Sequence, residues 1–262
     1  MPILLNYPPD QSLSYAEYGD SSGFPILVQH GLIASIDEGA IFDRLIRLGA
    51  RLICIARPGY GESSPHEMRN LGEWGEIVAA LVANHQLPQF DVLAMSSGAP
   101  YAYAIAAKLP QRVRNIYVFS GIPALYDQRI LAHWPFPVQK DATISEMQTL
   151  AYDLFFANLS LQDRSGAAVR DSMRNDCFGL AQDFKLRCLD WGFSLRDVTS
   201  PVFMRHSRRD PSVPFVAAQM TAALLPNCVF DPQDSDVHFS QETLDEFFAQ
   251  TIVSFYTGMN FT

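Results

Sequence analysis

The chain has 262 residues, of which 48% are hydrophobic and 18% are charged, and its formal net charge at pH 7 is -9. This length and composition fit a globular protein with one large domain, or with one domain that carries an insertion. The acidic balance argues against nucleic acid as a partner, because binding to a polyanion normally requires a basic surface.

Neither the start of the chain nor its apolar runs suggest a membrane protein. The first ten residues lack the basic cluster and the apolar stretch of a secretory signal. No run approaches the roughly 18 apolar residues that a membrane-spanning helix needs. The four cysteines show no C-x-x-C spacing, and Cys54 and Cys228 lie in predicted buried strands, which suits reduced thiols. We therefore expect a cytoplasmic protein without a membrane span.

Six apolar runs typical of buried strands alternate with segments of helical periodicity. They cover residues 25–29, 51–56, 90–95, 115–120, 201–206 and 228–231. An earlier run at residues 12–18 alternates between apolar and polar residues, and we predict it to be an antiparallel edge strand. The pattern predicts an α/β fold, in which a mostly parallel sheet has helices on both faces.

Two predicted helices have a clear apolar face. The first follows the strand at residues 51–56, and Asn70, with Glu73 three residues later, is a candidate N-cap. The second lies at the end of the chain and supplies another flanking helix. The faces consist of Trp74, Ile77, Val78, Leu81 and Val82 in the first helix and of Leu244, Phe247, Phe248, Thr251, Ile252 and Phe255 in the second.

The most informative motif is Ala94-Met95-Ser96-Ser97-Gly98, between the strand at residues 90–95 and a helix rich in small residues at 97–108. In the G-x-S-x-G elbow, a sharp strand-to-helix turn exposes the serine hydroxyl as a nucleophile. This chain keeps Gly98 but has Ala94 at the position of the first glycine. Small residues around a serine also occur in ordinary tight turns, where Ser96 would only cap a helix. Whether Ser96 is a nucleophile therefore depends on whether the rest of the sequence offers a histidine and an acid to activate it.

The strand pattern stops between residues 122 and 198, where the sequence becomes helical and rich in aromatic residues. We predict that residues 123–197 form a helical lid on a core made of residues 1–122 and 198–262. A capping box, Thr143-x-x-Glu146, opens one lid helix, with Met147, Leu150, Ala151, Leu154 and Phe155 on one face. Each aromatic residue alone is explained by packing of the lid, but together they favour an apolar cavity.

The last two predicted strands are followed by an acid and a histidine. Asp210 lies in the loop after residues 201–206, and His238 lies beyond residues 228–231. A serine becomes a nucleophile when an imidazole takes its proton and a carboxylate orients that imidazole. Ser96, Asp210 and His238 occur in the required order. Asp210 could instead only shape a turn, and His206 is a rival base, although its position at a strand end suits a packed residue better.

Other charged groups give weaker signals. Asp236 lies two residues before His238, where a negative charge would raise the pKa of the imidazole. No spacing of histidine, cysteine or carboxylate residues indicates a metal site, and no cofactor is expected.

Two more motifs complete a family pattern. His30-Gly31-Leu32 follows the strand at residues 25–29, and Arg57-Pro58-Gly59-Tyr60-Gly61 follows the strand at residues 51–56. With these, the whole chain resembles the α/β-hydrolase fold family in its lidded form. The family carries an HG turn, a PGxG loop, the nucleophile elbow, an acid after a late strand and a histidine near the C-terminus. Ala56 departs from the pattern, since an aspartate commonly precedes the R-P-G-x-G loop.

The resemblance implies both an architecture and a site. The expected architecture is a mostly parallel central sheet flanked by helices, with a helical lid inserted after the sixth strand. Ser96, Asp210 and His238 would form the catalytic triad. The backbone N–H groups of Leu32 and Ser97 would form the oxyanion hole, and His30 would have a structural role in holding the oxyanion loop.

The expected function is that of a serine hydrolase, which cleaves a small, largely apolar ester or related acyl compound through an acyl-enzyme. Hydrolysis of a carbon-carbon bond in a diketone-like substrate would use the same triad. A non-enzymatic ligand-binding receptor on the same scaffold also stays open. The serine at position 96 argues against dehalogenase and epoxide hydrolase chemistry, which uses an aspartate nucleophile on this fold. The natural substrate, its chain length and the oligomeric state do not follow from the sequence.

Overall fold

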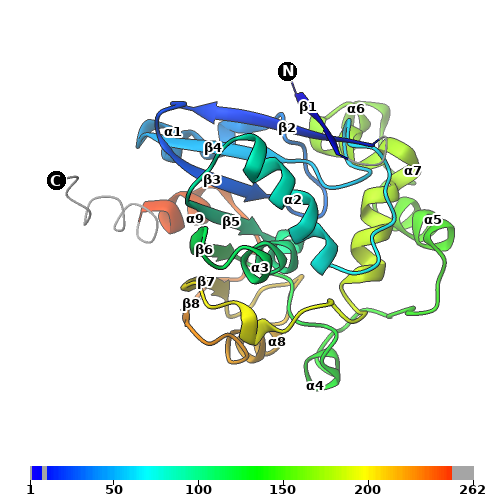
Figure 1. Cartoon of the computed structure of the whole chain (residues 1–262). Coiled ribbons are helices and arrows are strands. Elements are labelled where there is room, and N and C mark those ends of the chain that lie inside the picture. Colours follow the sequence, from blue (N-terminus) through cyan, green and yellow to red (C-terminus); the bar gives the residue numbers. More distant parts are fainter. Residues whose placement is uncertain (1, 8–10, 250–262) are drawn as a thin grey trace.

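The computed structural model describes residues 2–7 and 11–249, and in this part of the chain eight strands form one sheet (Figure 1). The strand order is β1-β2-β4-β3-β5-β6-β7-β8. β2 pairs antiparallel with both β1 and β4, and all the other neighbours are parallel. The strands are β1 (Ile3–Tyr7), β2 (Gln11–Gly19), β3 (Phe24–Gln29), β4 (Ala50–Ile55), β5 (Phe90–Met95), β6 (Val113–Phe119), β7 (Val202–Ser207) and β8 (Cys228–Gln233).

The prediction for the N-terminal strand was correct in orientation but wrong in position. β2 is antiparallel, as predicted, but it is not the edge of the sheet, because β1 pairs along its outer side. Ile3 and Leu4 in β1 are 44% and 53% exposed. Three apolar residues in a row, two of them exposed, give no period of two, so the alternation that marks a half-buried strand is missing.

Alternating strand residues build a core on each face of the sheet. Leu27, Val92 and Val118 belong to the core on the side of α2 (Gly72–Asn84) and α3 (Ala99–Lys108). Their neighbours along the strands, such as Ile26 and Leu93, belong to the core on the opposite face. That second core includes apolar side chains of α1 (Asp43–Arg47) and α9 (Gln241–Phe247), while α8 (Phe215–Ala222) packs near β7 and β8.

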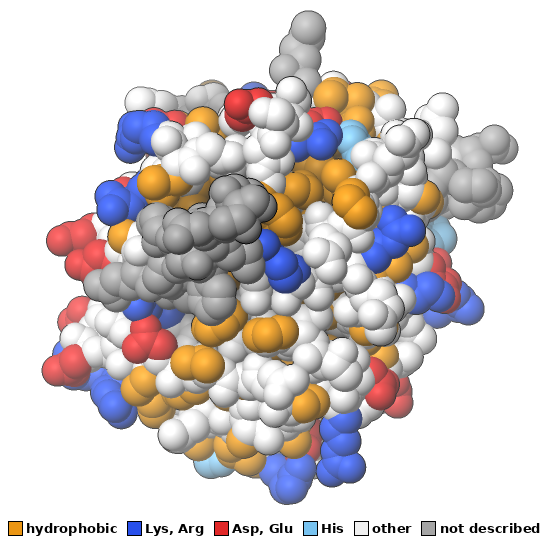
Figure 2. All heavy atoms as spheres, turned by 60° about the vertical axis from the view of Figure 1, so that its left-hand side comes forward, with side chains coloured by type: hydrophobic (Ala, Val, Ile, Leu, Met, Phe, Trp, Pro, Cys, Tyr) orange, Lys and Arg blue, Asp and Glu red, His pale blue; other side chains and the backbone are white. Residues whose placement is uncertain are grey.

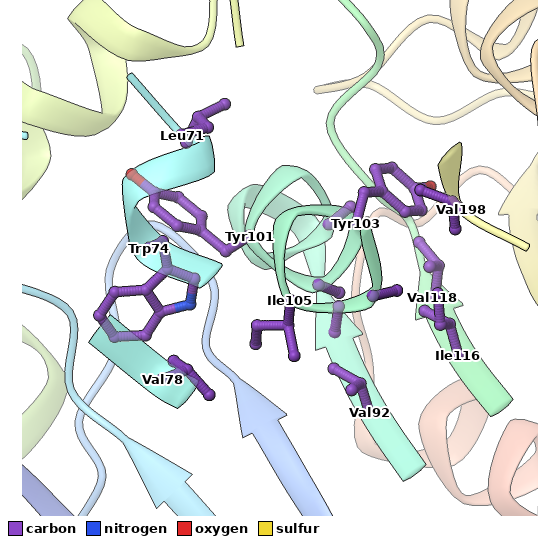
Figure 3. Close-up of a cluster of buried hydrophobic side chains, with 14 of the residues drawn as sticks. Leu71, Trp74, Val78, Val92, Tyr101, Tyr103, Ile105, Ile116, Val118 and Val198 are labelled. Carbon is purple, nitrogen blue, oxygen red and sulfur yellow. The ribbon is translucent and has the colours of Figure 1, made fainter. Parts of the chain in front are cut away.

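Figure 3 shows the core between the sheet and the helices α2 and α3. Trp74 of α2 lies edge-on to Tyr101 of α3, with 5.9 Å between the ring centroids. All five residues of the predicted apolar face of α2 are buried, so that prediction is confirmed. The helix begins one residue later than a cap at Asn70 would place it, but the Asn70 side chain still accepts a hydrogen bond from the N–H of Glu73.

The chain between β6 and β7 is helical, and in Figure 1 most of it lies on the right-hand side of the molecule, with α4 (Gln128–Leu131) at the bottom. The predicted capping box of Thr143 and Glu146 opens α5 (Ile144–Phe155), and α5 packs against α7 (Ala167–Leu186). Met147 and Ala151 are buried, but Leu154 is 62% exposed, so the apolar face is narrower than predicted. The segment contains α4 (Gln128–Leu131), α5 (Ile144–Phe155), α6 (Leu161–Arg164), α7 (Ala167–Leu186) and the 3-10 turn η3 (Leu195–Asp197).

The last helix agrees with the prediction as far as the structure describes it. Leu244, Phe247 and Phe248 are buried against the sheet. The other residues predicted for this face, Thr251, Ile252 and Phe255, lie outside the described residues.

The surface and the thiols carry few distinctive features. On the face shown in Figure 2, acidic and basic side chains are interspersed with apolar ones. The four cysteines are free thiols, and Cys54, Cys177 and Cys188 are buried. Over residues 2–7 and 11–249, none of the helices combines the length and the apolar character that crossing a membrane requires.

Candidate active site

Ser96 lies at the sharp turn between β5 and the short 3-10 turn η2 (Ser96–Gly98) that leads into α3. Its φ is +48°, a left-handed conformation that residues other than glycine rarely adopt. A Cβ atom at Gly98 would lie 2.2 Å from the carbonyl oxygen of Gln29, so only glycine fits there. Ala94 is completely buried in β5, and its methyl group is accommodated. The alanine at the first elbow position therefore leaves the turn intact.

The fold brings the three predicted residues together from distant parts of the chain. His238 Nε2 lies 3.0 Å from Ser96 Oγ, and His238 Nδ1 lies 2.8 Å from Asp210 Oδ2. Both distances are within hydrogen-bond reach. The His238 side chain is 22% exposed, whereas the Asp210 side chain is completely buried. Solvent therefore reaches this chain of hydrogen bonds at His238 and not at Asp210.

The surroundings of Asp210 keep it ionised. Its Oδ1 accepts hydrogen bonds from the N–H groups of Ser212 and Val213, at 2.8 and 2.9 Å. Burial would raise the pKa of Asp210, but the hydrogen bonds from His238 and from these two N–H groups outweigh it and lower the pKa. An ionised carboxylate only accepts hydrogen bonds, so Nδ1 of His238 carries a proton and Nε2 is free to accept one from Ser96.

The rival histidine lies behind the acid. His206 is completely buried at the end of β7, and its Nε2 lies 2.9 Å from the carbonyl oxygen of Val213 and 3.6 Å from Asp210 Oδ2. Burial lowers its pKa. Asp236 is exposed, and among the described residues its carboxylate forms no ion pair with His238. The geometry thus favours His238 over His206 as the base.

The two predicted oxyanion donors belong to the elbow and to the HG turn beside it. Ser97 follows Ser96 directly, and the HG turn approaches from β3, since a Cβ atom at Gly31 would lie 3.9 Å from Ser96 Cβ. Among the turns, loops and caps of the described residues, the N–H group of Leu32 donates to no backbone carbonyl.

A buried ion pair that the sequence did not indicate lies behind the HG turn. Arg57 Nη2 lies 2.7 Å from Asp183 Oδ2, and both side chains are almost completely buried. Burial would lower the pKa of Arg57, but the attraction of Asp183 outweighs it and raises the pKa. The carboxylate of this pair comes from α7. No local pattern could have identified Asp183, because 126 residues separate it from Arg57.

The ion pair holds the carbonyl groups of the HG turn. Arg57 donates to the carbonyl oxygens of His30 and Gly31, at 2.6 and 2.9 Å, and Tyr60 Oη lies 2.9 Å from that of Leu32. The His30 ring is fixed from both ends, since Nε2 accepts from the N–H of Arg57 and Nδ1 donates to the Gly31 carbonyl. Burial and the charge of Arg57 lower the pKa of His30 well below its usual value. This arrangement agrees with the structural role expected for His30.

A small cavity lies against the elbow, on the side of the helical segment. It is lined by Leu71, Ser97, Tyr101, Ile122, Asp183 and Arg187, with Pro100 at its wall. The N–H of Ile122 donates to the Ser96 carbonyl, which ties the chain after β6 to the elbow. Over residues 2–7 and 11–249, no group of three or more histidine, cysteine and carboxylate side chains is arranged to hold a metal ion.

The chain is similar to several known proteins. A family model described as the alpha/beta hydrolase fold matches residues 25–242. A curated relative, the uncharacterized hydrolase YcgS of Bacillus subtilis (strain 168), is 31% identical over 111 residues, which make up 42% of this chain and only 38% of that protein.

Two solved structures illustrate the likeness in fold. The esterase EaEST from Exiguobacterium antarcticum is 18% identical, with a TM-score of 0.76 over 98% of this chain and 100% of the other. A meta-cleavage product hydrolase, CumD, is 17% identical, with a TM-score of 0.69 over 99% of this chain and 98% of the other. At these identities the likeness concerns the fold alone.

Proposed function

Because the chain belongs to the α/β hydrolase fold family, we propose that it is a serine hydrolase that cleaves a small, largely apolar ester or related acyl compound through an acyl-enzyme. The observation that carries the proposal is the continuous line of hydrogen bonds from Asp210 through His238 to Ser96. Such a line is what turns a serine hydroxyl into a nucleophile.

In the proposed reaction, Ser96 Oγ attacks the carbonyl carbon while His238 Nε2 takes the hydroxyl proton. The tetrahedral intermediate collapses, His238 gives the proton to the leaving oxygen, and the acyl group remains on Ser96. Water then attacks the acyl carbon and passes a proton to His238. The second collapse releases the carboxylic acid and returns the proton to Ser96. Asp210 stays ionised throughout and stabilises the charged imidazole.

The N–H groups of Leu32 and Ser97 are proposed to hold the oxygen that becomes negative in each tetrahedral intermediate. Removing one such donor typically costs about 2.7 to 4 kcal/mol of transition-state stabilisation. The network of Arg57 and Asp183 supports this role, because its hydrogen bonds occupy the carbonyl groups of the same turn. Both proposed donors are backbone groups, so their side chains are poor targets for a test.

Residues 123–197 are proposed to act as a lid over this site. Asp183 and Arg187, which line the cavity beside the elbow, both belong to this segment. The same triad would also serve a carbon-carbon bond hydrolase, and the likeness to CumD keeps that chemistry among the substrates to be screened. The free cysteines support the cytoplasm as the proposed location.

Labelling with a fluorophosphonate probe, together with turnover of short p-nitrophenyl esters, tests the proposed nucleophile. We expect the unaltered protein to be labelled and to turn over the esters, and Ser96→Ala and His238→Ala to lose both properties. Ser97→Ala is the matched control, because only its backbone N–H is proposed to act, and it should still be labelled. Full labelling of Ser96→Ala would contradict the proposal, and a folded parent protein without labelling would favour the receptor alternative.

A further inference from the structure

A second histidine, His206, lies directly behind the acid of the proposed triad. It is the next-to-last residue of β7, a strand that pairs with β6 on one side and with β8 on the other. Its side chain is completely buried. Because neighbouring strands hold β7 on both sides, the sheet fixes the position of His206 independently of the loop that follows. The proposed mechanism gives this residue no role.

His206 is hydrogen-bonded to the far end of the loop that carries Asp210. Its Nε2 lies 2.9 Å from the carbonyl oxygen of Val213. Among the turns, loops and caps of the described residues, no backbone N–H donates to this carbonyl, so the imidazole supplies its hydrogen bond. The N–H of Val213 in turn donates to Asp210 Oδ1, at 2.9 Å. Val213 therefore connects the imidazole of His206 to the carboxylate of Asp210.

The imidazole of His206 is neutral and carries its proton on Nε2. Burial lowers the pKa of His206 below its usual value, so the ring has one proton at pH 7. A carbonyl oxygen only accepts hydrogen bonds, so this proton lies on the nitrogen that faces Val213. Nδ1 is buried and, within the part of the chain that the structure describes, has no hydrogen-bond partner. An apolar side chain would avoid the cost of this unpaired atom, so the donor on Nε2 is what a histidine adds here.

We propose that His206 is a positioning residue for the reaction, which holds Asp210 in the orientation that His238 requires. This inference rests on the proposed hydrolase function, since it concerns the acid of that same triad. A side chain of the sheet holds the Val213 carbonyl, so the Val213 N–H keeps its direction toward Oδ1 of Asp210. Oδ2 then stays directed at His238 Nδ1, 2.8 Å away. Proton transfer depends on this geometry, so a small displacement of the acid lowers the rate.

Three substitutions separate the hydrogen bond of His206 from its packing. His206→Leu removes the donor, His206→Gln places an amide N–H near the position of Nε2, and His206→Asn places one near that of Nδ1. We expect His206→Leu and His206→Asn to lower kcat for a p-nitrophenyl ester about ten-fold with little change in KM, and His206→Gln to recover most of this loss. Val78→Ala, in the core between α2 and the sheet, is the control for lost stability. It should lower the melting temperature without lowering kcat.

The proton on His238 Nδ1 provides a readout that does not depend on turnover. A proton between an imidazole nitrogen and a carboxylate gives a proton NMR signal well downfield of the backbone amides. We expect this signal in the unaltered protein and in His206→Gln. It should weaken or move upfield in His206→Leu and in His206→Asn, because Asp210 then loses its fixed orientation, and it should stay unchanged in Val78→Ala.

The outcomes separate this inference from the proposed function. An unchanged kcat in His206→Leu, or equal losses in His206→Gln and His206→Asn, would overturn the role of His206 even if fluorophosphonate still labels Ser96. If the parent protein is not labelled but the downfield signal depends on His206 as expected, the proposed catalysis fails and the orientation of Asp210 by His206 stands. Circular dichroism establishes that each variant is folded. If His206→Leu unfolds, the comparison of His206→Gln with His206→Asn decides.

Discussion

The two carboxylate oxygens of Asp210 have different hydrogen-bond partners, and this arrangement places the proton of His238 on Nδ1. Oδ1 accepts from two backbone N–H groups, whereas Oδ2 accepts from His238 Nδ1. The carboxylate can satisfy both sides only because it accepts hydrogen bonds at each oxygen.

Asp210→Asn is expected to lower kcat by about 10⁴-fold with little loss of fold. The amide oxygen would keep the hydrogen bonds to Ser212 and Val213, and the NH₂ group would then face His238. An NH₂ group donates, so Nδ1 would become the acceptor and Nε2 would carry the proton, which prevents it from accepting one from Ser96. Turnover of a p-nitrophenyl ester and the melting temperature check this together. A loss of less than about ten-fold would contradict the assignment of Asp210.

Ala94 shows how far a motif can vary at the residue scale. Its methyl group fits within β5, where it is completely buried, while Gly98 has no room for a methyl group beside the Gln29 carbonyl. The sequence alone could identify both as elbow residues. The space around each one decides that the first glycine can be replaced and the second cannot.

Among the elements, α7 connects the helical segment to the two loops beside the site. Tyr60 of the PGxG loop packs on Gly179, where a Cβ atom would lie 2.3 Å from its ring. The Gly61 N–H donates to the Asp171 carbonyl, and Asp183 pairs with Arg57. These contacts make the position of the HG turn depend on α7, because Arg57 holds the carbonyl groups of that turn.

Asp183→Ala is therefore expected to destabilise the protein by about 3 to 5 kcal/mol, because it leaves a buried guanidinium without its partner. Lys185→Ala is the matched control on the same helix, since Lys185 pairs with Glu67 at the surface. Such a surface pair contributes roughly 0 to 1 kcal/mol. Urea unfolding of the two variants measures the difference. Equal free energies of unfolding would show that the buried pair does not stabilise the fold.

At the scale of the whole molecule, buried histidines make stability depend on pH. Burial lowers the pKa of both His30 and His206 below the usual 6.5. As the pH falls below 6.5, the unfolded chain takes up protons that the folded chain does not, so the free energy of unfolding decreases. Each histidine contributes up to about 1.4 kcal/mol per pH unit in the window between its folded and unfolded pKa values.

We expect the free energy of unfolding to fall between about pH 6.5 and pH 5, and the fall to be less steep in His206→Asn. The slope is compared rather than the stability itself, because the variant also loses the contact of His206 with the Val213 carbonyl. His133→Asn, at an exposed histidine, should leave the slope unchanged. An unchanged slope in His206→Asn would show that its imidazole titrates equally in the folded and unfolded states.

The sequence by itself determined the features that depend on neighbours along the chain. Strand and helix periodicity identified the sheet and the apolar face of α2, and the Thr143 capping box marked the start of α5. The small residues around Ser96 indicated the turn, and chain order indicated its partners. The sequence did not predict β1, because its apolar residues follow one another directly and are partly exposed.

Only the tertiary structure decided which distant side chains meet. Asp183 pairs with Arg57, and Arg187 lines the cavity beside the elbow, because the helical segment packs onto the loops of the core. Nothing in the local sequence of α7 distinguishes these two residues from surface charges. Asp183 meets Arg57 only because packing brings together residues that are 126 positions apart, and both side chains are buried, so each charge needs the other.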